Sequence, residues 1–140
     1  MKSDLLPTLL FVWLALALPA DAQEITVNPG NWQYSANGVM GPIVVSESGT
    51  ECVAPEEAMV DLRQIVEDLD AECVLSDIEQ SGEKLTATLT CQGALPLTAE
   101  LDVAVTDSGA RANIRGQMSA GEGLDFPVDL SATAIRTGAC

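Results

Sequence analysis

Four cysteines are the residues of this 140-residue chain whose type and spacing first suggest chemistry: Cys52, Cys73, Cys91 and Cys140. A cysteine can serve as a nucleophile, as a zinc ligand or as half of a disulfide. Structural zinc sites use closely spaced cysteine pairs or histidines, but these cysteines are 21, 18 and 49 residues apart and the chain has no histidine. No Cys-x-x-Cys redox motif occurs either. The spacing therefore favours disulfides over metal or redox chemistry.

The lack of histidine also restricts catalysis. It excludes a Ser-His-Asp triad and any acid–base step that uses imidazole. The 21 Asp and Glu residues remain, and paired carboxylates can hydrolyse glycosides. Most of them fall on faces that the pattern predicts to be solvated, and the acidic run at 68–72 lacks the glycine and downstream glutamate of a calcium loop. The sequence predicts no catalytic residue, no metal and no cofactor, with a carboxylate-dependent hydrolase as the alternative.

The N-terminal segment has the pattern of a secretory signal peptide. Lys2 precedes an apolar run over residues 9–18, and Ala20-Asp21-Ala22 supplies a small-x-small cleavage site. The run is shorter than the ~20 apolar residues that a membrane-spanning helix needs. We therefore predict cleavage after Ala22, a single mature domain over residues 23–140, and no integral membrane segment after cleavage.

The predicted mature chain is strongly acidic. It holds five cations against 19 acids, a net charge of −14. Phosphate binding needs clustered lysine and arginine, so the charge excludes a nucleic-acid partner and disfavours anionic membrane surfaces. An even number of cysteines in an exported chain is typical of disulfide-bonded proteins from oxidising compartments.

One pairing of the cysteines is favoured by a predicted hairpin. Residues 85–91 alternate apolar residues with threonine, as a strand with one buried face does, and Ser81-Gly82 supplies a turn. A three-residue loop over 81–83 pairs Gln80 with Lys84, and the same register sets Cys73 opposite Cys91, within disulfide reach. Four cysteines allow three pairings. This register selects Cys73–Cys91 and leaves Cys52–Cys140, which ties the last strand to the segment before a helix.

The rest of the chain is read as strands around one helix. Short strands are expected at 32–36 and 43–48, and a helix at about 55–70, with Pro55 in its first turn. The expected apolar stripe of this helix is Met59, Leu62, Val66 and Leu69. Beyond residue 91, three alternating segments are separated by turns at 107–109 and 120–123. The predicted fold is mainly β with one α-helix: a single antiparallel meander sheet, curled or half-barrel-like, packed on the helix and held by disulfides.

Two aromatic residues are the candidate ligand-binding residues. Trp32 and Tyr34 are two positions apart in the first predicted strand, so they share one face of it. Such a pair is either part of the core or the aromatic wall of a concave apolar site. The sequence leaves both readings open.

Several landmarks resemble a known family when they are taken in order. They are Pro29, Gly30, Trp32, Cys52, Pro55, Cys73, Cys91 and the closing residues 135–140. Together they resemble the small exported bacterial proteins of domain-of-unknown-function family 3617, over essentially the whole predicted mature chain. The methionine-rich insert often found between the first two strands of that family is reduced here to Met40, and Ile135 and Gly138 are separated by two residues.

The resemblance implies an exported, periplasmic protein and implies no activity. Together with the residues themselves, it favours a non-catalytic binding or interaction module of the cell envelope. The partner expected for such a module is an envelope protein or a small apolar ligand.

Overall fold

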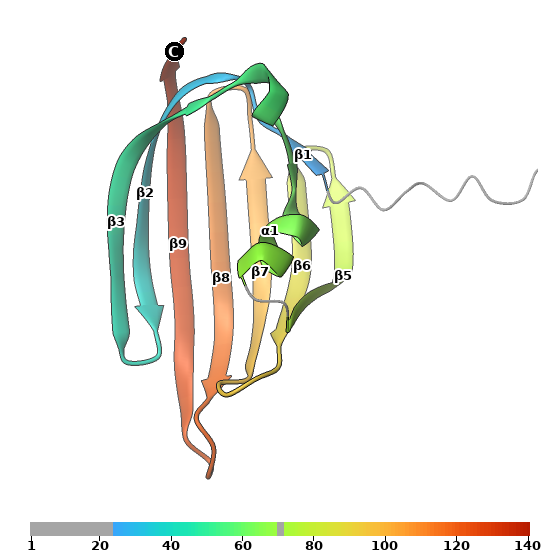
Figure 1. Ribbon diagram of the computed structural model, residues 1–140, viewed down its shortest axis with the longest axis vertical. Helices are drawn as coiled ribbons and strands as arrows, with labels where there is room; N and C mark the ends of the chain where they lie inside the picture. Colours follow the sequence, from blue (N-terminus) through green and yellow to red (C-terminus); the bar gives the residue numbers. More distant parts are fainter. Residues whose placement is uncertain (1–23, 70–71) are drawn as a thin grey trace, which may run out of the picture.

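The structure is a computed structural model that describes residues 24–69 and 72–140. The predicted signal peptide, residues 1–22, lies outside the described residues. The described chain is mainly antiparallel β with one α-helix, as the sequence predicts (Figure 1). Its elements are β1 (Glu24–Thr26), β2 (Gly30–Met40), β3 (Ile43–Val53), the 3-10 helix η1 (Pro55–Glu57), β4 (Met59–Asp61), α1 (Leu62–Leu69), β5 (Cys73–Ser81), β6 (Lys84–Cys91), β7 (Leu97–Val105), β8 (Gly109–Ser119) and β9 (Asp125–Gly138).

Seven of the strands form one antiparallel sheet in the order β3-β2-β9-β8-β7-β6-β5. The strands from β5 to β9 follow one another as a meander, and the β2–β3 hairpin joins this meander through β2, which pairs with β9. The remaining strands, β1 and β4, form a separate two-stranded sheet that the sequence analysis did not predict.

The sheet has one apolar and one polar face because alternate side chains point to opposite sides. One cross-strand row on the apolar face consists of Val103, Ala112, Ala132 and Ala36 on β7, β8, β9 and β2. The neighbouring row on the polar face consists of Asp102, Asn113, Ser131 and Asn37. The apolar and polar residues that alternate in the sequence therefore lie on opposite faces of the folded sheet, as predicted.

The core lies where α1 packs on the apolar face of β5 and β6. Leu75, Leu85 and Ala87 are buried there, and Leu62 and Val66 of α1 pack against them. Leu85 is only 2% exposed. Figure 1 shows α1 in front of β6 and β7, at the end of a segment that crosses the sheet from β3 toward β5.

The helix is shorter than the expected 55–70, and two local contacts explain why. The Asp61 carboxylate accepts a hydrogen bond from the backbone N–H of Arg63 (2.9 Å), so it caps a helix that begins at Leu62. Upstream, the backbone N–H of Val27 donates to Ala58 O (2.7 Å), and β1 takes residues 59–61 as its partner strand. The prediction that Met59 belongs to the buried stripe is wrong, since its side chain is 63% exposed.

The β5–β6 hairpin has the expected pairing of cysteines but a different turn. Ser81 pairs with Lys84, so the loop is the two residues Gly82 and Glu83 and not the expected three. This one-residue shift is reversed by a bulge between Ser76 and Glu79, beyond which Cys73 again faces Cys91. Two departures from the expected register thus cancel before the cysteines are reached.

The first two long strands extend well beyond the expected 32–36 and 43–48. Each has 11 residues, and their register is unbroken from the Gly30–Val53 pair to the Met40–Ile43 pair. Gly41, with φ +61°, and Pro42 form the two-residue turn between them. Residues 35–38, rich in small polar residues, are strand because β3 and β9 both pair with them, and tertiary pairing outweighs their low strand propensity.

Candidate functional site

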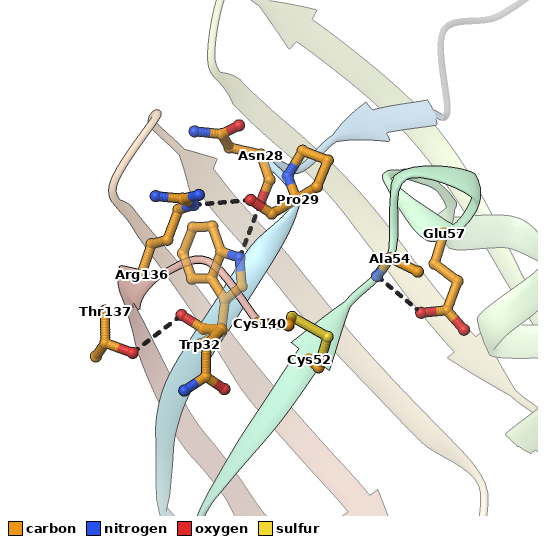
Figure 2. The surroundings of a disulfide bond; sticks show 10 residues. Asn28, Pro29, Trp32, Cys52, Ala54, Glu57, Arg136, Thr137 and Cys140 are labelled. Carbon is orange, nitrogen blue, oxygen red and sulfur yellow. Dashed lines mark hydrogen bonds between the residues drawn. A yellow bond between two sulfur atoms is a disulfide. The ribbon is translucent and has the colours of Figure 1, made fainter.

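Both pairs of cysteines that the sequence favours are disulfides in the structure. Cys52 is bonded to Cys140 with their Cα atoms 5.8 Å apart, and Cys73 is bonded to Cys91 with their Cα atoms 4.0 Å apart. The first bridge links β3 to the segment after β9, across the intervening β2 (Figure 2). All four cysteines are thereby removed from thiolate chemistry.

Trp32 lies in a hydrogen-bonded corner at the start of β2. Its side chain is 4% exposed, and its Nε1–H donates to the carbonyl of Asn28 (2.9 Å). The guanidinium Nε of Arg136, the cross-strand partner of Trp32, donates to the carbonyl of Pro29 (2.8 Å; Figure 2). These two side chains satisfy carbonyls of a segment that is outside the sheet, so they fix the entry of the chain into β2.

Gly30 completes the same corner. Its φ is +144°, and a Cβ atom there would lie 2.5 Å from Arg136 Nε and would also overlap the carbonyl of Gly138. Only glycine fits between these groups. The Pro29-Gly30-x-Trp32 motif is therefore explained by the packing of β2 against the end of β9.

Tyr34 has a different environment, although it shares the face of Trp32 as predicted. It is 38% exposed and lies across Gly49, its partner on β3, where a Cβ atom would come within 2.7 Å of the phenol oxygen. The ring covers backbone that a glycine leaves bare, a known device for stabilising glycine in an edge strand. The surroundings of Trp32 and Tyr34 thus fit structural roles in the corner and at the edge.

A cavity of about 410 Å³ lies at the end of the sheet beneath β1. Its lining combines apolar residues such as Ile25, Val27 and Val105 with Lys84 and Asp107. Trp32 and Tyr34 are not among its lining residues. Asn28 closes one side by donating from its side-chain amide to the carbonyl of Asp107 (3.2 Å).

A second hollow, about 340 Å³, lies on the polar face next to the β5 bulge. Four carboxylates line it, those of Asp77, Glu79, Glu100 and Asp102. All four residues are exposed, unlike a catalytic acid that is held protonated in an apolar pocket. Within residues 24–69 and 72–140, no group of three His, Cys, Asp or Glu residues is arranged to hold a metal ion.

The helix covers only part of the apolar face of the sheet. Arg63, Val66 and Glu67 line a small hollow with residues of β5, so this side of α1 turns toward that edge. The helical period places Ile65 on the other side of α1, and its side chain is 43% exposed. Helix α1 therefore leaves a large part of the apolar side of the sheet uncovered (Figure 1).

We call this surface the open apolar face. It spans β8, β9, β2 and β3, over whose central part Figure 1 shows no helix. Its residues are only partly buried; they are Ala36, Val45, Ala112, Ile114, Leu130 and Ala132. Two charged side chains, Glu47 and Glu51, extend from the same side of β3, where they oppose Ala36 and Trp32, and both residues are exposed.

Comparison with known proteins establishes the family. Residues 27–140 match the family described as "Protein of unknown function (DUF3617)". The chain belongs to the DUF3617 family. The comparisons find no match among curated proteins and none among solved structures. Within the described residues, no helix of this DUF3617 protein is long and apolar enough to cross a membrane.

The sequence analysis did not single out the open apolar face or the two glutamates at its edge. A signal for the edge was present, because small polar residues and Cys52 alternate along one strand with Val45, Glu47, Gly49, Glu51 and Val53. It was missed because the expected strand ended at residue 48. The relation of this strand to β9 and to the open face depends on pairings between residues about 100 positions apart.

Proposed function

We propose that this DUF3617 protein is an exported, non-catalytic binding module of the cell envelope that uses the open apolar face. The observation that carries the proposal is the partial cover of the sheet. Helix α1 buries the apolar side of β5 and β6, whereas Ile114, Leu130 and Ala132 remain partly exposed beyond it. Partly exposed apolar surface that is continuous over several strands is typical of an interaction site. The occupant is a small apolar ligand or an apolar surface of an envelope protein.

The lack of catalysis in this proposal rests on the available side chains. The chain has no histidine, its cysteines form disulfides, and the carboxylates that gather on the polar face are exposed. A hydrolase would have to use that carboxylate-lined hollow. Hydrolysis of glycosides from a fluorogenic panel by the wild-type protein, abolished by Glu100→Gln, would favour the hydrolase over the binding module.

Two substitutions on neighbouring residues test the binding surface. Ala132 and Thr133 lie in the middle of β9 and differ in the face they present, Ala132 on the open apolar face and Thr133 on the polar face. A neutral apolar dye, N-phenyl-1-naphthylamine, should brighten on binding the wild-type protein, and its binding should raise the melting temperature by mass action. We expect Ala132→Glu to weaken dye binding at least tenfold and Thr133→Glu to leave it unchanged. Equal effects of both substitutions, or no binding by the wild-type protein, would refute the proposal.

Export is tested separately on the protein recovered from its native host. Mass spectrometry should find an N-terminus at Gln23, because the leader has the pattern of a cleaved signal peptide. The two disulfides fit an oxidising compartment. Recovery of the chain with an intact Met1 in a membrane fraction would contradict both cleavage and the periplasmic location.

A further inference from the structure

We propose that β3 is the docking site for an extended segment of a basic partner protein, which adds to the sheet as an eighth strand and carries two cationic side chains opposite Glu47 and Glu51. The proposal goes beyond the open apolar face, because its main contacts are backbone hydrogen bonds at the edge of the sheet. In the seven-stranded sheet, β3 and β5 form the two edges. These two edges differ in ways that matter for strand addition.

The β5 edge is protected. A bulge between Ser76 and Glu79 interrupts its register, and Asp77 within it has a φ of +50°. Bulges and covering elements are common devices that prevent another strand from pairing with an edge. Helix α1 also packs beside β5 on the apolar side.

The β3 edge has no such interruption. It runs for 11 residues in unbroken register with β2, and it contains neither proline nor lysine. The disulfide at Cys52 holds its C-terminal end to the rest of the sheet. An edge of this kind presents a long row of backbone groups in the geometry that a further strand needs.

The direction of these backbone groups follows from one hydrogen bond. Gly41, which follows β2, donates its N–H to the carbonyl of Pro127 in β9, so odd-numbered residues of β2 direct their backbone groups toward β9. Even-numbered residues of β2 therefore bond to β3, and their partners there are odd-numbered, as in the Met40–Ile43 pair. The backbone N–H and C=O groups that are free to bind a further strand belong to the even-numbered residues of β3, such as Ser46, Ser48 and Thr50.

The same geometry determines where charge is needed. Glu47 and Glu51 do not bond outward, so a residue facing either one is in a non-hydrogen-bonded pair, where cross-strand side chains are closest. The face of β3 that carries them reads Val45, Glu47, Gly49, Glu51 and Val53, a palindrome. A partner strand can therefore run in either direction. Its alternate residues would be apolar, cationic, of any type, cationic and apolar, opposite Val45, Glu47, Gly49, Glu51 and Val53.

Charge argues against a second copy of this chain as the occupant. Two-fold pairing of β3 with itself about Gly49 would set Glu47 of one copy against Glu51 of the other twice, and like charges directly opposite are destabilising. Each copy would also bring a net charge of −14 over residues 23–140. Both facts favour a cationic partner over a second copy of the chain.

A synthetic peptide of 11 residues tests the proposal. One side of its strand is all threonine, and the other reads Val, Lys, Tyr, Lys and Val at alternate positions. Fluorescence anisotropy of the labelled peptide should show binding to the wild-type protein, at least tenfold tighter than that of the same peptide with glutamate in place of lysine. Combining Glu47→Lys with Glu51→Lys should reverse this preference. A matched control on the opposite edge, Glu79→Lys with Glu83→Lys, should change affinity by twofold or less.

Backbone pairing is separated from simple charge attraction in two ways. Ser48→Pro removes an outward N–H that β2 does not use, and alternate N-methylation of the peptide removes the partner donors without altering the protein. We expect each change to weaken binding at least tenfold. Binding that survives both, a preference that charge reversal does not invert, or no binding at all would overturn the proposal. So would self-association in sedimentation that Ser48→Pro abolishes, since β3 would then serve a second copy. The dye experiment with Ala132→Glu does not involve this edge, so either proposal can fail alone.

Discussion

The disulfide between Cys52 and Cys140 should contribute more to stability than the one between Cys73 and Cys91. In the chain-entropy treatment, a bridge restricts the unfolded chain in proportion to the logarithm of the loop it closes. The inner bridge closes a loop of 18 residues, worth about 3.2 kcal/mol. The outer bridge spans 88 residues, but the inner one lies within it and shortens the loop to 88 − 18 = 70 residues, worth about 4.4 kcal/mol.

Urea unfolding of two double variants measures this difference. Replacing Cys52 and Cys140 by serine should lower the free energy of unfolding by about 4.4 kcal/mol. Replacing Cys73 and Cys91 should lower it by about 3.0 kcal/mol, because the outer loop then lengthens to 88 residues. With a urea m-value of roughly 1–3 kcal/mol/M, the midpoint of the first variant should fall by about 1.5–4 M. Its m-value should also rise, because a less restricted unfolded chain exposes more surface.

The reasoning would be refuted if the inner pair contributed more than the outer pair, since loop length would then not govern the effect. Circular dichroism of each variant before unfolding provides the control, because the comparison requires that both begin from the folded sheet. Both variants replace two cysteines by two serines, so the change of residue type is the same in each and needs no further control.

Three other substitutions, two of them with a matched control substitution, test the core and the β2 corner. Leu85→Ala should lower the free energy of unfolding by about 2–5 kcal/mol, because the Leu85 side chain is 2% exposed. The control Leu95→Ala, at a residue that is 53% exposed, should change it by about 0.5 kcal/mol or less. Chemical denaturation measures both, and similar losses for the two variants would contradict the assigned core. Trp32→Phe should cost at least about 1 kcal/mol because the Asn28 carbonyl loses its donor, and an unchanged melting curve would count against that hydrogen bond. Gly30→Ala should lower the melting temperature more than Gly121→Ala. Both glycines have positive φ, but only Gly30 is crowded by Arg136 and Gly138. The reverse order of melting temperatures would contradict the packing described for the corner.

Local patterns predicted the strands of the meander well, because each strand alternates apolar and polar residues between turns that contain glycine. The disulfide pairing was also predicted, although the register argument behind it used the wrong turn. A two-residue loop and the bulge near Asp77 offset each other. The correct pairing thus depended on two errors that cancelled.

Features that depend on distant residues were less predictable. The helix was expected to include Met59, but β1 pairs with that segment from more than 30 positions away. β2 and β3 were expected to be short, because their polar and glycine-rich residues have low strand propensity and the pairing of β2 with β9 could not be read locally. The open apolar face follows from that same pairing, so its location also required the three-dimensional structure.

The pairing of β2 with β9 also determines the order in which the sheet can be assembled. The β2–β3 hairpin is made early during synthesis, yet the strand that joins it to the sheet is made about 100 residues later. Until β9 is in place, both edges of the hairpin are unpaired. From β5 to β8, each strand pairs with the next strand in the sequence, so this part of the sheet can form first and the hairpin can join it last. The unpaired edges of the hairpin are therefore the part of the sheet most open to aggregation before β9 is in place.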